Sequence, residues 1–165
     1  MFLGTYEHSM DAKGRISLPS RFRETLVGQG DPRLVLTTNV DAAGRCLVAY
    51  TYPESIAFHE KIADLPQFDE NVIRLKRLHI AGAAETTPDR QGRILIPPML
   101  RAYAGLSDDK AQNHGEESKA GPRQVVFAGL GTTIEIWDRH RWDQERELAK
   151  EALPQINEAL ARLGL

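Results

Sequence analysis

A nine-residue stretch near the N-terminus occurs a second time in the second half of the chain. It reads DAKGRISLP over residues 11–19 and DRQGRILIP over residues 89–97. A constant offset of 78 aligns residues 7–26 with residues 85–104 without a gap, and seven of the 20 aligned pairs are identical. Two segments of ordinary composition would share about one. We therefore expect two structurally equivalent repeats.

Each copy of the stretch begins with a tight turn. Asp11 and Gly14 hold its first and last positions, and Asp89 and Gly92 hold them in the second copy. Asp accepts backbone hydrogen bonds in such turns, and Gly adopts backbone angles that other residues avoid. We predict that these four residues shape the turns, and that strands over residues 3–8 and 15–18 form a β-hairpin around the first turn.

The strand after each turn alternates apolar and polar side chains. Alternation places Ile16 inward and Arg15 outward, and it does the same for Ile94 and Arg93. An outward arginine beside a turn can be an ordinary solvated residue. Its planar guanidinium, fixed on a strand, also suits a phosphate group or a guanine base.

Further elements follow each copy in the same order. The patterns predict strands at 34–37, 46–50, 125–128 and 134–137, and helices at 21–27, 53–63, 70–80, 99–104 and 139–163. We expect the helices at 21–27 and 99–104 to stop at Gly28 and Gly105, the last helix to be interrupted at Pro154, and a turn at 41–44. The polar stretch 107–122 is predicted to be a mobile insertion. The expected units are a first repeat (1–82), a second repeat (83–152) and a C-terminal helical tail (153–165).

Composition excludes several classes of protein. The 165 residues include 21 basic and 23 acidic ones, a net charge of -2, so the chain lacks the overall positive field of a histone-like binder. Cys46 is the single cysteine, and the five histidines lack metal-ligand spacing. No apolar run approaches the roughly 20 residues of a membrane span, and the N-terminus lacks a signal peptide. We expect a cytoplasmic protein with no metal, cofactor, membrane partner or small-molecule substrate.

Enzyme signatures are also lacking. No Gly-x-Ser-x-Gly motif occurs, and the sequence around Gly129 and Gly131 lacks the third glycine of a dinucleotide fingerprint, since Ile134 stands there. We therefore expect no catalytic activity. We expect a structural role for two clusters. One is a solvated or interprotomer helix face formed by Arg74, Lys76, Arg77 and His79. The other consists of the packing residues Trp137, Trp142, Tyr50 and Tyr52.

The opening sequence MFLGTYEHSMDAKGRISLP, residues 1–19, resembles that of the bacterial MraZ proteins, and so do the second copy and EIWD at 135–138. The resemblance covers nearly the whole chain except 107–122 and the tail past about residue 152. It implies an α+β, β-rich fold: a duplicated AbrB-like swapped-hairpin barrel with peripheral helices and a pseudo-twofold axis. It also implies a nucleoid-associated transcriptional regulator that binds repeated sites upstream of its own division and cell-wall gene cluster and forms ring-like homo-oligomers.

The expected partner is double-stranded DNA, bound by basic residues of both copies. Residues 11–23 carry a local charge of +3, since they include four basic residues and one acidic residue. We predict that the two turns enter the major groove and carry Lys13, Arg15 and Arg93 into it. The residues expected to contact phosphates are Arg21, Arg23 and Arg101. Because Gln91 replaces Lys13 in the second copy, we expect the second turn to be less basic.

Two alternatives stay open at this point. In the first, the chain is an oligomeric interaction scaffold, its arginines form salt bridges between protomers, and its amphipathic C-terminal helix binds a partner. In the second, it is a β-barrel enzyme that binds a small molecule or anion.

Overall fold

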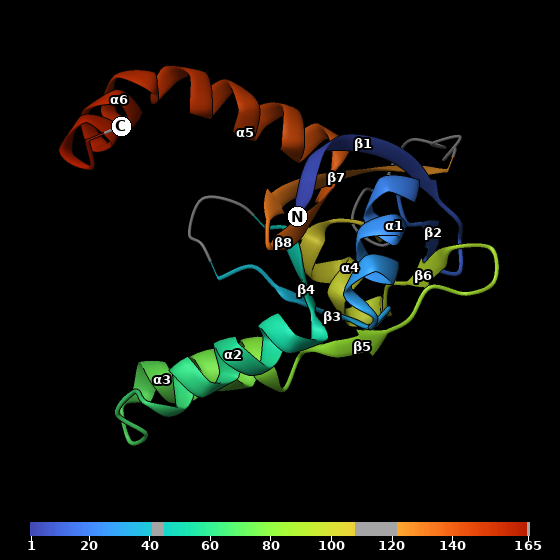
Figure 1. Ribbon diagram of the computed structural model, residues 1–165, viewed down its shortest axis with the longest axis horizontal. Coiled ribbons are helices and arrows are strands. Elements are labelled where there is room, and N and C mark those ends of the chain that lie inside the picture. The colour runs from blue at the N-terminus through green and yellow to red at the C-terminus, as the bar shows by residue number, and fades with distance from the viewer. Residues whose placement is uncertain (41–44, 108–121, 165) are drawn as a thin grey trace, which may run out of the picture.

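The computed structural model describes residues 1–40, 45–107 and 122–164. The strands in these residues form one antiparallel sheet, nearly closed into a barrel, in the order β5-β3-β4-β8-β7-β1-β2-β6 (Figure 1). The strands are β1 (Phe2–Met10), β2 (Arg15–Ser17), β3 (Leu34–Thr38), β4 (Leu47–Thr51), β5 (Ala84–Thr86), β6 (Arg93–Leu95), β7 (Arg123–Gly131) and β8 (Thr133–Asp138). The α+β class with an antiparallel barrel is confirmed, although helices hold more of the described residues than strands do.

The helices lie close to their predicted positions. They are α1 (Ser20–Gln29), α2 (Tyr52–Ala63), α3 (Glu70–Leu75), the π-helix η1 (Lys76–Ile80), α4 (Pro98–Ala104), α5 (Arg139–Glu151) and α6 (Leu153–Arg162). The carboxylates of Asp69 and Asp138 accept backbone N–H groups at the starts of α3 and α5, as N-caps do. The predicted turn at 41–44 and residues 108–121 of the predicted insertion lie outside the described residues.

The predicted end of the first helix was wrong. Helix α1 continues through Gly28 and ends at Gly30, which takes the left-handed conformation with a φ of 78°. A glycine inside a helix lowers its stability without breaking it, so the glycine that adopts the left-handed cap conformation ends the helix. Helix α4 does end at Gly105, which has a φ of 69°.

The predicted local hairpin was only partly right. Strands β1 and β2 are joined by the expected turn, but they pair at a single position, Met10 with Ile16. Strand β1 instead pairs with β7 along its whole length, from Phe2 opposite Gly131 to Met10 opposite Arg123. The β1–β7 ladder is therefore longer than the β1–β2 ladder, and its second strand belongs to the other repeat. A prediction that pairs strands adjacent in sequence does not find such an exchange between repeats.

The two repeats interlock at β2 and β6. Ile16 lies opposite Ile94 at the centre of this pair, with Arg15 opposite Leu95 on one side and Ser17 opposite Arg93 on the other. An exchange of the two copies leaves this register unchanged, as a pseudo-twofold axis between Ile16 and Ile94 requires. Each repeat contributes four strands to the barrel, and the boundary at residue 82 stays a prediction.

One apolar core fills the barrel with side chains from both repeats. Ile16 and Ile94 are each 1% exposed, as inward alternation predicts. Helices α1 and α4 cover the barrel with equivalent side chains, Phe22 and Leu100. A fully buried side chain of this size stabilises the fold by about 1.5–3 kcal/mol. Because neither repeat encloses this core alone, the stability of each depends on the other.

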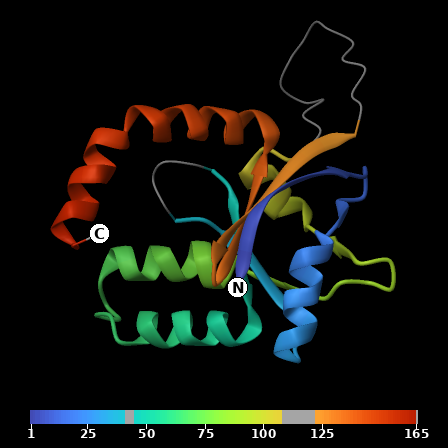
Figure 2. The same cartoon turned by 45° about the horizontal axis from the view of Figure 1, so that its top comes forward.

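The helices that follow β4 and β8 form two projections, which we call the helical arms: α2 with α3 and η1, and α5 with α6. Both arms extend to one side of the barrel, whereas the turn after β1 and the loop before β6 lie on the opposite side, as Figures 1 and 2 both show. Within the described residues, no helix is long and apolar enough to cross a membrane.

His79 differs from the expected solvated face. The π-helical turn η1 directs its ring inward, where it is 1% exposed and packs against Phe58 and Tyr50. Its Nδ1 lies 2.9 Å from the Thr38 carbonyl oxygen and donates to it. Burial lowers the pKa of His79 and is the largest effect, the hydrogen bond to Thr38 opposes it, and the charge of the nearby His59 lowers the pKa further. The imidazole is therefore held neutral.

We predict that acid destabilises the protein through His79. Because its pKa is lower in the folded state than the ordinary value of 6.5, the unfolded chain binds a proton that the folded chain excludes. The free energy of unfolding is therefore unaffected well above pH 6.5 and falls as pH drops through that value. Melting curves between pH 7.5 and 5 should show a smaller loss of Tm in His79→Gln than in the wild type. Equal losses would show that His79 is not the group responsible.

Candidate nucleic-acid interface

The turn after β1, residues 11–15, is organised by a single carboxylate; we call it tip one. Asp11 Oδ1 accepts the backbone N–H groups of Lys13 and Arg15 at 3.0 and 2.9 Å, and Oδ2 accepts the Arg15 Nε–H at 2.8 Å. The Gly14 N–H donates to the Asp11 carbonyl at 2.9 Å, which closes a β-turn. The Arg15 side chain, 39% exposed, is thereby fixed beside the turn.

Residues 89–93, tip two, repeat this geometry. Asp89 Oδ1 accepts the N–H groups of Gln91 and Arg93 at 2.8 and 2.9 Å, and Oδ2 accepts the Arg93 Nε–H at 2.9 Å. Hydrogen bonds from the backbone N–H groups of Arg15 and Arg93, together with their guanidinium groups, lower the pKa values of Asp11 and Asp89 respectively. Both carboxylates are therefore charged at neutral pH and hold their arginines in place.

The glycines of the two tips are required by conformation and by space. Gly14 and Gly92 have φ values of 84° and 75°, in the left-handed region that other residues rarely adopt. A Cβ built on Gly14 would lie 2.7 Å from the Ile96 carbonyl oxygen and 2.8 Å from Arg101 Nε. The partner in this close contact comes from the other repeat.

The β2–β6 pair brings the two outward arginines together. Residues directly opposite each other in an antiparallel pair point to the same face, so Arg15 and Arg93 share the outer face, on either side of the pseudo-twofold axis. Lys13 is exposed at tip one. Both tips lie at the end of the barrel away from the helical arms (Figure 1).

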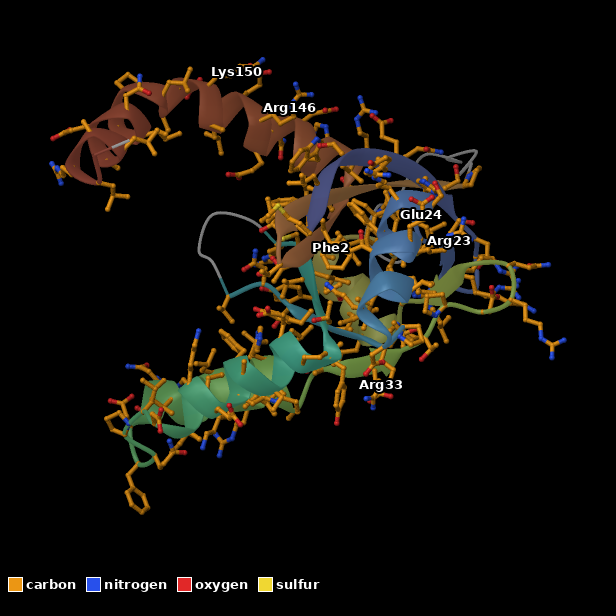
Figure 3. All side chains as sticks on the ribbon, in the orientation of Figure 1. Phe2, Arg23, Glu24, Arg33, Arg146 and Lys150 are labelled. Carbon is orange, nitrogen blue, oxygen red and sulfur yellow. The ribbon has the colours of Figure 1, made fainter. Side chains whose placement is uncertain are left out.

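The three residues expected at phosphates have unequal positions. Arg21 extends from α1 with 74% of its side chain exposed and pairs with Glu24 on the same helix at 3.5 Å. Arg23, also on α1 (Figure 3), lies against Gly92 of tip two. Arg101, on α4, is partly buried against Gly14 of tip one. Arg21 and Arg23 are both exposed, whereas Arg101 is partly buried.

Sequence reasoning missed Arg90. It is exposed in tip two, at the position that Ala12 occupies in tip one. Two basic residues and one acidic residue therefore give each tip a charge of +1, while the longer segment 89–101 (+2) stays less basic than 11–23 (+3). A comparison of the turns at the offset of 78, position by position, would have found it. Within the described residues, no three His, Cys, Asp or Glu side chains gather as a metal site.

Comparison with known proteins identifies the family. The family profile described as "MraZ protein, putative antitoxin-like" matches residues 1–70 and 79–162. The chain belongs to the MraZ family. The protein named transcriptional regulator MraZ from Acetivibrio thermocellus is 39% identical over 165 residues, which is all of both chains. Those of the same name from Coxiella burnetii (39%, 92% of this chain and 90% of the relative) and Thermomicrobium roseum (37%, 99% of each) are also similar.

Membership of the MraZ family agrees with the interlocked repeats. The profile match is interrupted after residue 70 and resumes at residue 79, within the helical arm that begins with α2. The matched residues include both tips. The resemblance drawn from residues 1–19 and 89–97 is therefore confirmed over the chain as a whole.

We predict that Gly14→Val destabilises the fold by more than the strain of its φ angle. A left-handed conformation costs a residue with a Cβ about 1–2 kcal/mol, and the contact with Ile96 and Arg101 adds to this cost. Gly30→Val is the control, because Gly30 has a φ of 78° but no described atom within 4 Å of its Cβ position. Each kcal/mol corresponds to about 2–4 °C in Tm for a chain of this size. Equal melting temperatures of the two variants would contradict the close contact.

Proposed function

We propose that this protein is a transcriptional regulator that binds specific double-stranded DNA with the face formed by the two tips. The observation that carries the proposal is the pair of arginines, Arg15 and Arg93, each fixed by a turn carboxylate and both presented on one two-stranded ribbon. The relatives' name, transcriptional regulator MraZ, supports it. The regulated sites are proposed to be repeated elements upstream of the protein's own division and cell-wall gene cluster.

The geometry suits the major groove. That groove is about 12 Å wide and admits a two-stranded β-ribbon, and the strands of a ribbon such as β2–β6 are about 4.8 Å apart. A guanidinium already held in one orientation by Asp11 or Asp89 loses little conformational freedom when it meets the edge of a guanine. Arg15 and Arg93 are therefore proposed to contact bases.

The charge distribution supports phosphate contacts around this ribbon. Residues 11–23 carry +3 and residues 89–101 carry +2, whereas the whole chain carries -2. The positive potential is thus concentrated at the tip end of the barrel. Lys13, Arg21 and Arg90, all exposed there, are proposed to meet phosphates.

One ribbon makes few base contacts, so we also propose that the protein acts as a ring-like homo-oligomer on several sites at once. Helix α6 supports this proposal, because its apolar residues Ile156 and Leu160 recur every four positions and are 40% and 39% exposed. A helix of ten residues is marginal alone in water. A second copy that covers this apolar face would stabilise it.

We predict salt-dependent, sequence-specific binding that is lost in Arg15→Ala. Titration of DNA from upstream of the protein's own gene, with a shuffled duplex as control, should give an affinity that falls with salt, by about 0.9 log units per phosphate contact for each tenfold increase. Arg15→Ala and Arg93→Ala should each weaken binding by about 1–3 kcal/mol. Wild-type affinity in both variants, or equal affinity for both duplexes, would favour the interaction scaffold instead.

We predict that light scattering gives the wild type a mass that is a multiple of 18.4 kDa. The double variant Ile156→Glu, Leu160→Glu should have a smaller mass, because it places charge on the apolar face of α6. Glu158→Gln is the matched control, since Glu158 pairs with Arg162 on the same helix, and its mass should equal that of the wild type. A monomeric wild type at micromolar concentration would contradict self-association.

A further inference from the structure

Arg23 and Arg101 are each packed against the turn glycine of the opposite repeat. A Cβ built on Gly92 would lie 2.7 Å from Arg23 Cζ, and one built on Gly14 would lie 2.9 Å from Arg101 Cζ. Both arginines and both glycines are related by the offset of 78. The contact therefore occurs twice, crossed between the repeats, which a chance approach of one flexible side chain does not produce.

The backbone makes the same crossed connection. The Leu18 N–H donates to the Gly92 carbonyl, and the Ile96 N–H donates to the Gly14 carbonyl, both at 2.9 Å. Leu18 leads directly into α1, which carries Arg23, and Ile96 leads into α4, which carries Arg101. Each tip thus contacts one hydrogen-bond donor and one guanidinium group, both supplied by the other repeat.

The charges of these arginines are directed at the tips. Within the described residues, neither guanidinium pairs with a carboxylate, and Arg101 Nε is buried without a hydrogen-bond partner. Arg23 also lies near His8, whose pKa is lowered by burial and then by the charge of Arg23. Arg21 differs from both, although it is on the same helix as Arg23: it is 74% exposed and pairs with Glu24.

We propose that Arg23 and Arg101 are positioning residues, each of which orients the recognition arginine of the opposite repeat. Arg101 covers Gly14 and thereby fixes the turn that aims Arg15, and Arg23 covers Gly92 and fixes the turn that aims Arg93. This inference rests on the proposed DNA-binding function and revises the expectation that Arg23 and Arg101 contact phosphates. A lysine keeps the charge, but it has no planar group to cover the glycine.

The test is a set of double-mutant cycles on DNA affinity. Arg101→Lys should weaken binding of the upstream duplex by about five- to 150-fold, up to the full loss of one arginine–base contact. This loss should disappear in the Arg15→Ala background, where tip one has no arginine to aim, and persist in the Arg93→Ala background. Arg23→Lys should show the mirror pattern: no loss in Arg93→Ala and full loss in Arg15→Ala.

Arg146→Lys is the control, because Arg146 is exposed on α5 at the end of the barrel away from the tips (Figure 3), and this variant should bind like the wild type. Melting curves of every variant show whether binding is measured on folded protein. Should Arg101→Lys fail to fold, Arg23→Lys still tests the proposal, because the Arg23 side chain is on the exposed side of α1.

Three results would overturn the inference. Wild-type affinity in both lysine variants would show that the planar guanidinium groups of Arg23 and Arg101 do not position the tips. Equal losses in the two alanine backgrounds would indicate a general loss of stability rather than crossed positioning. A wild type without salt-dependent binding to the upstream duplex would refute the proposed function itself, and the inference with it, whereas binding without the crossed pattern refutes the inference alone.

Discussion

The structure depends on one short antiparallel contact, the pairing of β2 with β6 around Ile16 and Ile94. These two side chains belong to a core that is built from both repeats. The same contact carries the crossed hydrogen bonds to Gly14 and Gly92, so it fixes the tips as it fixes the core. Stability and the geometry of the candidate interface therefore rest on the same few residues.

The rest of the molecule is divided between the two ends of the barrel (Figures 1 and 2). Strands β2 and β6 leave the barrel at one end through turns that need glycine and carboxylate, and these turns gather the positive charge. The helices that follow β4 and β8 leave at the other end as helical arms (Figures 1 and 2). Apolar residues of α6 and basic residues of α5 such as Arg146 and Lys150 (Figure 3) extend there, away from the tips. Binding of DNA and contact with other copies would then use separate surfaces.

Within the two tips, the turn residues are strictly duplicated and the charged residue beside them is not. Asp, Gly and Arg occupy equivalent places in both turns with hydrogen bonds that agree within about 0.2 Å, whereas the charge beside them has moved from Lys13 to Arg90. The position of this charge can change because both side chains are solvated and make no packing contact that depends on it. Arg15 and Arg93 cannot move to another position in the turn in the same way, because each is held by the turn carboxylate.

The elements that depend on local chemistry could be predicted from the amino-acid sequence. The repeated Asp-x-x-Gly turns, the inward Ile16 and Ile94, the caps at Asp69 and Asp138 and the break near Pro154 are all set by residues within a few positions of one another. The tertiary structure alone decided which strands pair, that His79 is buried, and that Arg23 and Arg101 lie beneath the glycines of the opposite repeat. Those outcomes depend on contacts between residues about 20 to 130 positions apart, and the periodicity of one segment carries no information about the partner that covers it.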